Sequence, residues 1–299
     1  NGGGSLSEAL ELTGLFIEQG PVVQTRDSTG NVEINGDKDP SIAYAGPLAI
    51  LVDRNSASAS EIFAGAIQDY RRGIIIGEPT FGKGTVQNIV DLNRFIRNAK
   101  VDHGRLKTTI AQFFRISGSS NQFKGVIPDI QFPTMDKESE YGERSLENAL
   151  PWDQVKAADF IKVNSPIENF AEAAARHRKR IQSNKAFQLL LQQINLVESN
   201  NDKKTVSLVE SERIAERDEL MANRKALQNE IRVAQGLDPL PEDTDLSEID
   251  EEEVKDTSEI LLNETAMILD DLINHTALKN NKGFQSVQQS DNPGISNNL

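Results

Sequence analysis

The clearest pattern in the chain is a helix followed by a buried strand within residues 55–77. Small residues at 55–60 lead into a segment whose apolar positions recur every three or four residues, which predicts a helix that begins near Ser58. Residues 73–77 place three isoleucines between two glycines, which predicts a short buried strand. A serine-rich helix start and a buried strand therefore follow one another directly.

The residues before this pair predict a helix and further strands. A broad apolar face over residues 5–19 predicts a helix that a glycine-proline pair ends. Residues 22–24 predict a strand, residues 26–39 a polar excursion like a hairpin, and residues 47–52 an apolar strand that enters the serine-rich segment. This order of elements predicts a layered α/β unit.

The pattern changes to strands and then to helices in the rest of the chain. Residues 85–133 predict an all-β region, with strands over 85–92 and 107–116 and a closing segment at 125–130. Helical spacing dominates afterwards. The elements predicted there are helices over 151–194, 211–235 and 257–278, a short strand over 205–209, an acidic linker over 237–250, and a disordered tail over 279–299.

Charge separates the two parts of the chain. The net charge is −14, of which residues 1–135 carry −1 and the remainder carries −13. Such an acidic surface disfavours nucleic acid and anionic membranes as partners. We interpret the short basic run at 176–180 as one solvated helix face rather than a phosphate site. The chain has no cysteine, which excludes thiol chemistry, and no apolar run approaches the roughly 20 residues that span a bilayer.

Ser58 has an ordinary and a functional interpretation. With Glu61 three residues later it forms a capping box, which satisfies free backbone donors at the helix start. A nucleophilic serine also benefits from a helix N-terminus, because this provides N–H groups and a positive dipole for an oxyanion. The amide of Ala59 is well placed to be one such donor.

A lysine is the available base for such a serine. The chain has only three histidines, His103, His177 and His275, and two of them fall in the predicted helical region. A buried lysine with a lowered pKa acts as a base near neutral pH. Lys83, which stands between two glycines, is the candidate, and its ordinary interpretation is a solvated turn lysine.

The same loop resembles a phosphate-binding loop only superficially. Residues 77–84 match that pattern up to the last position, where Gly84 replaces the serine or threonine that binds magnesium. The following residues alternate as a strand, whereas a phosphate-binding loop opens a helix. We therefore do not predict nucleotide binding, and the predicted chemistry requires no metal or other cofactor.

Two segments together carry a family resemblance. Residues 52–62 and 77–87 resemble the active-site segments of the tail-specific proteases, also called C-terminal processing peptidases, which are serine proteases with a Ser-Lys dyad. In that family the serine precedes the lysine by 25 positions, which selects Ser58 rather than Ser56 or Ser60 as the partner of Lys83.

The resemblance implies further site residues. A glutamine four positions after the lysine orients it in the family, and Gln87 matches this position. Residues 1–4 resemble the end of a glycine-rich element whose amide is the second oxyanion donor. We choose Gly3 for this role, with Gly2 and Gly4 left open, and Ala59 as the first donor. Asp129 lies in another segment typical of the family, and we interpret it as part of a turn rather than a catalytic acid.

The resemblance also implies the architecture and the partners. It predicts the C-terminal part of a crotonase-like α/β protease core over residues 1–135, a helical C-terminal domain over 136–278, and a disordered tail over 279–299. It further implies a fragment without its N-terminal and PDZ regions, a periplasmic location, and substrates selected by an apolar C-terminal tail. An adaptor protein remains an open question.

The predicted reaction is peptide-bond hydrolysis through an acyl-enzyme. Ser58 attacks the carbonyl, and Lys83 acts first as base and then as acid. Two alternatives remain from the sequence. One is an inactive homologue that only binds proteins, and the other is a crotonase-type enzyme that acts on acyl-CoA.

Overall fold

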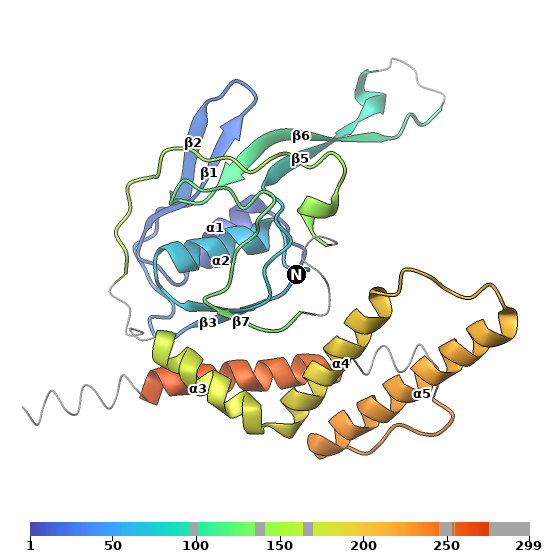
Figure 1. Ribbon diagram of the computed structural model, residues 1–299. Coiled ribbons are helices and arrows are strands. Elements are labelled where there is room, and N and C mark those ends of the chain that lie inside the picture. The colour runs from blue at the N-terminus through green and yellow to red at the C-terminus, as the bar shows by residue number, and fades with distance from the viewer. Residues whose placement is uncertain (96–100, 135–140, 164–169, 245–252, 254, 275–299) are drawn as a thin grey trace, which may run out of the picture. The chain divides into compact units, whose positions relative to one another are not determined.

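The computed structural model forms two compact units, which we describe separately (Figure 1). The first unit comprises Asn1–Ser165 and Ile194–Lys203, and the second comprises Pro166–Gln193 and Lys204–Leu299. The structure describes residues 1–95, 101–134, 141–163, 170–244, 253 and 255–274.

The first unit contains two sheets. One is antiparallel and four-stranded, in the order β2-β1-β6-β5, and the other is parallel and three-stranded, in the order β3-β4-β7. The antiparallel sheet consists of β1 (Gly20–Asp27), β2 (Val32–Asp37), β5 (Thr85–Asp91) and β6 (Arg105–Phe114). The parallel sheet consists of β3 (Ala49–Val52), β4 (Ile74–Gly77) and β7 (Ile130–Gln131). Short 3₁₀ turns, η1 (Leu92–Phe95) and η2 (Glu143–Ser145), follow β5 and β7.

Two helices, α1 (Leu6–Gly14) and α2 (Ala59–Asp69), lie between the two sheets (Figure 1). One side of α2 packs on β1 and β6 through Ile62 and Ala66, and the other packs on β3 and β4 through Ile67. A helix buried on two sides is apolar around most of its circumference, which explains the dense apolar spacing in its sequence. The result is a β-α-β sandwich that confirms the predicted α/β core.

Asp129 joins β7 to its neighbours rather than only shaping a turn. Its carboxylate accepts hydrogen bonds from the Ile75 amide, at 2.8 Å, and from Gln68 Nε2, at 3.1 Å. The first bond reaches β4 and the second reaches α2. Asp129 therefore links β7 to β4 and α2, and these two bonds account for its carboxylate without a catalytic role.

The prediction of helix over residues 151–163 was wrong, because this segment is extended and packs on the first unit. The Trp152 indole N–H donates to the Ser120 carbonyl at 3.0 Å, and the amides of Ala158 and Val163 donate to the carbonyls of Ile116 and Tyr70 at 2.9 Å. The segment's amides are thus bonded to the core, whereas a helix would bond them to its own carbonyls.

Two smaller predictions also differ from the structure. The first helix ends at Gly14 rather than at residue 19, because the amides of Leu15 and Phe16 turn back three residues to Leu12 and Thr13. Residues 205–209 are irregular rather than a strand. Leu208 there is 98% exposed, so the segment's apolar residues have no sheet to pack against.

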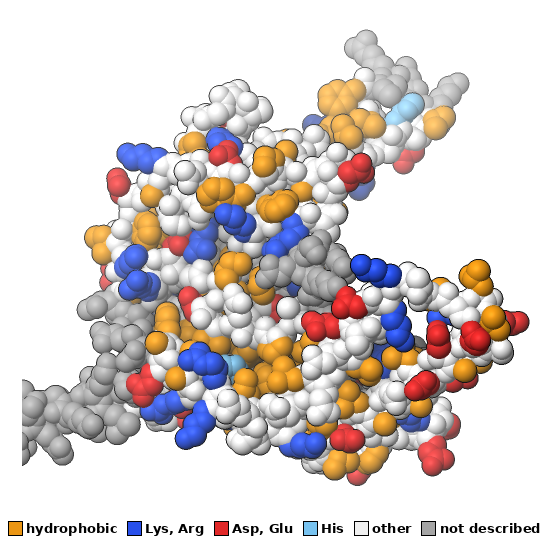
Figure 2. Space-filling view, viewed as in Figure 1, with side chains coloured by type: hydrophobic (Ala, Val, Ile, Leu, Met, Phe, Trp, Pro, Cys, Tyr) orange, Lys and Arg blue, Asp and Glu red, His pale blue; other side chains and the backbone are white. Residues whose placement is uncertain are grey.

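The helices of the second half agree with the predicted spacing from residue 170 onwards. They are α3 (Phe170–Ser183), α4 (Lys185–Asn201), α5 (Glu210–Ala234) and a helix over residues 255–274. Acidic, basic and hydrophobic side chains are mixed over the surface of α5 (Figure 2). Gly236, at φ 79°, follows the end of α5 as predicted. The predicted tail at 279–299 lies outside the described residues.

The interpretation of the basic run at 176–180 as one solvated face holds only in part. Arg176, Arg178 and Lys179 are exposed, whereas His177 and Arg180 face another helix. His177 is buried, and its Nδ1 lies 2.8 Å from Glu264 Oε1. Arg180 binds Glu264 and Asp271, each at 2.7 Å. The run therefore pairs α3 with the helix over 255–274, because buried charges require opposite charges nearby.

Candidate active site

The turn that carries Ser58 connects the end of β3 to the start of α2. Ser56 fixes this turn, because its hydroxyl donates to Asp53 Oδ1 at 3.0 Å and accepts from the Asp53 amide at 3.1 Å. The next helical residue after Ser58 is Ala59. Ser58 therefore sits at a strand-to-helix turn, with the amides of the helix N-terminus beside it.

Ser58 has a strained backbone. Its φ is 59° and its ψ is −115°, a region that residues with a side chain rarely adopt. Such strain costs of order 1–3 kcal/mol and persists only where surrounding contacts hold it. Nucleophilic serines on sharp strand-to-helix turns show the same feature, because the turn exposes the hydroxyl.

The first residues of the chain pack directly against this turn. The Asn1 carbonyl accepts the Ala57 amide at 3.1 Å, and the Gly3 amide donates to Asn1 Oδ1 at 3.0 Å. Gly3 has φ 90°, and a Cβ there would lie 2.5 Å from the Ala57 carbonyl and 2.8 Å from the Ala59 nitrogen. Only glycine fits this position, and it places Gly3 beside both Ser58 and Ala59.

The carboxylate of Glu61 joins the serine turn to the lysine loop. Its Oε2 accepts the Ser58 amide at 2.8 Å and the Lys83 amide at 3.0 Å. Its Oε1 accepts the Thr80 hydroxyl at 2.5 Å and the Gly82 amide at 2.8 Å. One side chain therefore holds Ser58 and Lys83 next to each other, although they are 25 positions apart in the sequence.

Burial changes the acidity of this carboxyl. Glu61 is 0% exposed, and the loss of solvation raises its pKa to about 7, while its four hydrogen bonds oppose the shift. A carboxyl group this deeply buried requires its four donors, because unpaired polar groups are costly in the interior.

Gln122 supports the lysine loop from the other side. Its side chain is fully buried, and its Oε1 accepts the Gly84 amide at 2.8 Å. Its Nε2 donates to Glu143 Oε1 at 3.1 Å and to the Leu150 carbonyl at 3.0 Å. The loop around Lys83 is thus held through its backbone amides, and the lysine side chain is not needed to hold it.

The structure places the predicted site residues as follows. Ser58, Ala59, Gly3 and Lys83 lie in segments that contact one another, through the bonds described above. Gln87 lies on β5 opposite Thr109, with its side chain exposed. Of the histidines, His177 is engaged with Glu264 in the second unit, and His275 lies outside the described residues.

Sequence reasoning missed the bridging role of Glu61 and the roles of Thr80 and Gln122. The capping-box pattern of Ser58 and Glu61 was visible, but it predicts only the bond to the Ser58 amide. Thr80 and Gln122 have no local pattern that marks them. Their signal is burial of a polar side chain, which appears only in the folded chain.

We expect Glu61→Gln to lower kcat about 10²-fold, the cost of a displacement of about 1 Å in a catalytic geometry. The amide is isosteric, but its NH₂ group cannot accept hydrogen bonds, so either the Ser58 and Lys83 amides or the Thr80 and Gly82 donors lose their acceptor. Steady-state kinetics measures the effect. Glu78→Gln is the matched control, because the Glu78 carboxylate accepts a bond from the Arg54 amide only weakly, at 3.3 Å. Equal kinetics of both variants would contradict the bridging role.

Glu61 also predicts a pH dependence of stability. Its folded pKa of about 7 lies above the ordinary 4.5, so the protonated form favours the folded state. Its contribution is complete below pH 4.5 and is lost as the pH rises through 7, by about 3 kcal/mol. Urea unfolding at pH 5 and pH 8 measures this change. The Glu61→Gln protein should lack this part of the pH dependence. If its free energy of unfolding changed between pH 5 and pH 8 as much as that of the wild-type protein, the raised pKa of Glu61 would not be the cause.

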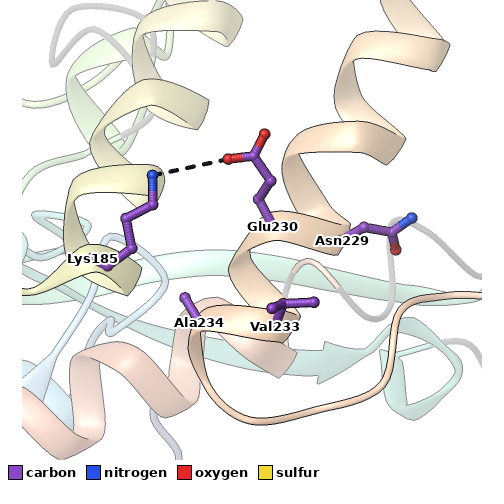
Figure 3. Close-up of a pocket in the computed structure, with 5 residues that line it drawn as sticks. All are labelled: Lys185, Asn229, Glu230, Val233 and Ala234. Atoms are coloured by element: carbon purple, nitrogen blue, oxygen red, sulfur yellow. Dashed lines mark ion pairs between the residues drawn. The ribbon is translucent and has the colours of Figure 1, made fainter.

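The second unit contains a surface cavity of about 390 Å³, between the start of α4 and the end of α5 (Figure 3). Lys185 and Glu230 point towards each other across it, with Nζ and Oε2 3.9 Å apart, and Val233 and Ala234 also line it. Both charged side chains are more than 60% exposed, so their attraction is weak. The lining contains no serine, threonine or cysteine, and the Ser58 site remains the candidate active site.

Two family models match the sequence of this chain. The family model described as peptidase family S41 matches residues 1–132, and the model for the C-terminal domain of tail-specific protease matches residues 137–274. Residues 1–132 belong to peptidase family S41. Within the described residues, no helix is long and apolar enough to cross a membrane.

The relatives that match this chain are longer than the chain itself. The tail-specific protease of Haemophilus influenzae is 42% identical over 254 residues, which are 81% of this chain and 36% of that protein. The carboxy-terminal-processing protease of Bartonella bacilliformis is 40% identical over 44% of this chain and 28% of that protein. The solved photosystem II D1 C-terminal processing protease is 38% identical, with a TM-score of 0.39, over 44% of this chain and 32% of that chain. The chain thus spans about a third of these relatives.

Proposed function

We propose that the chain is the catalytic and helical C-terminal part of a tail-specific serine endopeptidase that works through a Ser58–Lys83 dyad. The observation that carries this proposal is the Glu61 carboxylate, which accepts the amides of both dyad residues beside a strained Ser58. Membership in the S41 family adds the reaction class, which is hydrolysis by a serine-type peptidase.

The reaction begins with attack of Ser58 Oγ on the scissile carbonyl carbon, while the Lys83 amine takes the hydroxyl proton. The amides of Ala59 and Gly3 stabilise the oxyanion of the tetrahedral intermediate, and the C–N bond then breaks as Lys83 returns its proton to the leaving amine. Water, deprotonated by Lys83, hydrolyses the acyl-enzyme. Gln87 orients the lysine.

The Gly3 amide is the less direct of the two oxyanion donors. It is bonded to Asn1 Oδ1, so it must exchange this acceptor for the oxyanion during the reaction. Loss of one oxyanion donor costs roughly 10²- to 10³-fold in kcat. Gly3 remains our choice because it packs against Ser58 and Ala59, whereas a Cβ at Gly2 or Gly4 would have no atom within 4 Å.

The remaining proposals concern the whole protein. Its substrates are proteins with apolar C-terminal tails, and its location is the periplasm, as the resemblance to the bacterial tail-specific branch implies. Residues 1–135 form the C-terminal part of the protease core, and residues 136–278 form the C-terminal domain, in which the described α-helices begin at residue 170 and residues 141–163 lie in the first compact unit.

A labelling experiment tests the function. Full-length protein is treated with a fluorophosphonate, which modifies activated serines, and the labelled peptide is identified by mass spectrometry. Modification of Ser58 together with cleavage of an unfolded reporter protein supports the proposal. A protein that binds the reporter without labelling or cleavage is the inactive homologue, and thioester turnover without peptide cleavage indicates the acyl-CoA enzyme.

A further inference from the structure

One short segment, residues 141–146, contacts both the serine turn and the lysine loop. It includes η2 and belongs to the first compact unit. In sequence, however, it lies within residues 137–274, which match the model for the C-terminal domain of tail-specific protease, whereas the S41 model matches residues 1–132. The 141–146 segment therefore adds contacts to the site that the S41 part of the chain does not supply by itself.

Tyr141 joins this segment to the serine turn. Its hydroxyl donates to Asn55 Oδ1 at 2.5 Å. The Arg54 guanidinium lies 5.2 Å from the centre of the Tyr141 ring, within the range of a cation–π contact. Asn55 and Arg54 precede Ser58 by three and four positions. The phenol group and the ring of Tyr141 thus both contact the turn that carries the nucleophile.

The same side chain also contacts the lysine loop. The rings of Tyr141 and Phe81 meet edge to face, with their centroids 5.9 Å apart and an interplanar angle of 84°. The Glu143 amide donates to the Phe81 carbonyl at 2.8 Å. Phe81 precedes Lys83 by two positions. Tyr141 therefore bridges the serine turn and the lysine loop.

Gly142 allows the segment to approach the lysine loop this closely. Its φ is 83°, and a Cβ at this position would lie 2.5 Å from the Phe81 carbonyl oxygen. A residue with a side chain fits neither this backbone conformation nor this space. The contact between the segment and the loop is therefore built into the backbone as well as into the Tyr141 side chain.

Glu61 and Tyr141 hold different parts of the two turns. The Glu61 carboxylate is fully buried and accepts the backbone amides of the dyad residues, whereas the partly exposed Tyr141 contacts side chains two to four positions earlier. The Phe81 amide also donates to the Ser56 carbonyl at 3.0 Å. Contacts at several separate points fix the relative rotation of the two turns as well as the distance between them.

We propose that Tyr141 is a positioning residue for the dyad, through which the start of the C-terminal domain fixes the serine turn against the lysine loop. This inference rests on the proposed function. Transfer of the hydroxyl proton from Ser58 to Lys83 requires a fixed geometry between the two side chains, and a displacement of about 1 Å costs about 10²-fold in rate. Tyr141 acts through the two turns and makes no contact with the substrate.

Substitution of Tyr141 in full-length protein tests this role. Tyr141→Phe removes only the hydroxyl and its bond to Asn55. We expect kcat for an unfolded reporter protein to fall about tenfold, the effect of one lost hydrogen bond, and KM to stay unchanged. Tyr141→Ala also removes the ring contacts and should lower kcat about 10²-fold. Asn55→Ala combined with Tyr141→Phe should lower kcat no more than either change alone, because both remove the same bond.

Tyr44→Phe is the matched control, because Tyr44 makes the same three kinds of contact elsewhere in the first unit. Its hydroxyl donates to the Pro47 carbonyl at 2.9 Å, its ring meets Phe16 edge to face with centroids 6.4 Å apart, and the Arg72 guanidinium lies 5.9 Å from the ring centre. None of these partners belongs to the serine turn or the lysine loop. We expect Tyr44→Phe to keep kcat within about threefold.

A glycine pair tests the same contact through the backbone. Gly142→Ala places a methyl group against the Phe81 carbonyl and should lower kcat about tenfold through loss of the Glu143 bond. Gly30→Ala is its control, because Gly30 has a similar φ of 87° but a Cβ there would have no atom within 4 Å. Both variants carry the backbone strain of a left-handed residue, and only one of them disturbs the lysine loop.

Fluorophosphonate labelling distinguishes positioning from a loss of folding. A displaced dyad predicts that every molecule is labelled at Ser58 but at a rate about tenfold lower, in line with kcat. A partly misfolded protein is labelled incompletely. Circular dichroism and urea unfolding of all variants accompany the kinetics.

The outcomes separate this inference from the proposed function. Lower kcat and slower but complete labelling of Tyr141→Phe, with unchanged KM and an unaffected Tyr44→Phe, support it. Equal kinetics of the two phenylalanine variants overturn it and leave the peptidase function intact. Incomplete labelling, a raised KM with unchanged kcat, or a higher kcat of Tyr141→Phe would assign a structural role, a substrate contact or a restraint, and each overturns it. If the wild-type protein is neither labelled at Ser58 nor cleaves the reporter, the proposed function fails and this inference fails with it.

Discussion

Replacing Ser58 by alanine is expected to lower kcat for an unfolded reporter protein about 10⁶-fold, the typical cost of removing a serine nucleophile. The backbone strain at φ 59° and the helix N-terminus at Ala59 both favour an exposed, reactive hydroxyl at this position. Single-turnover kinetics in full-length protein measures the change, and the fluorophosphonate label should disappear with it.

The neighbouring serines provide the controls for this prediction. Ser60→Ala should keep kcat within about threefold, because its hydroxyl lies outside the proposed reaction path and surface-type changes are usually small. Ser56→Ala should lower stability by about 1 kcal/mol through loss of its bonds to Asp53 while it retains labelling at Ser58. Near-normal cleavage by the Ser58→Ala protein would show that another residue is the nucleophile.

Replacing Lys83 by alanine is expected to lower kcat by a similar factor of about 10⁶, because removal of the base disables the nucleophile as fully as removal of the serine. Lys83→Arg should be equally inactive, since a guanidinium keeps its proton and cannot act as a base. The backbone bond from residue 83 to Glu61 persists in both variants, so the loop should remain in place. Rates of acylation, measured with an activated ester, report on this step directly.

Lys124→Ala is the matched control for the lysine. Lys124 also lies in a loop of the first unit, where its amine stands 3.8 Å from the centre of the Trp152 ring, and its removal lowers the positive charge by the same amount. We expect it to retain kcat within about threefold, as exposed substitutions usually do. Retained activity in Lys83→Arg would show that the lysine acts through its charge alone, and the dyad mechanism would then be wrong.

Local sequence patterns predicted most of the first unit correctly. The helix at 59–69 and the strand at 74–77 match the periodicity of their apolar residues, because each buries most of its surface. The strands at 85–91 and 105–114 overlap the predicted ranges. The extended segment at 151–163 could not be predicted in this way. Its amides bond to Ile116, which follows β6, and to Tyr70 at the end of α2, and nothing local in the sequence specifies those partners.

The basic run at 176–180 shows the same limit for charged residues. A cluster of positive charge on a helix is usually solvated, but His177 and Arg180 have the partners Glu264 and Asp271, which follow more than 80 positions later. Only the packing of α3 against the helix over 255–274 brings them together.

For the site, the sequence by itself determined the candidate residues and the family to which they belong. Ser58 and Lys83 were candidates from their local sequence, and the family resemblance selected Ser58 among the serines and implied Gln87 and Gly3. The tertiary structure decided how Ser58 and Lys83 come together. The Glu61 carboxylate accepts both of their amides because the β4 strand returns the chain to the start of α2. A capping box is local and visible in sequence, whereas a shared acceptor between two loops depends on the fold that brings them within hydrogen-bonding distance.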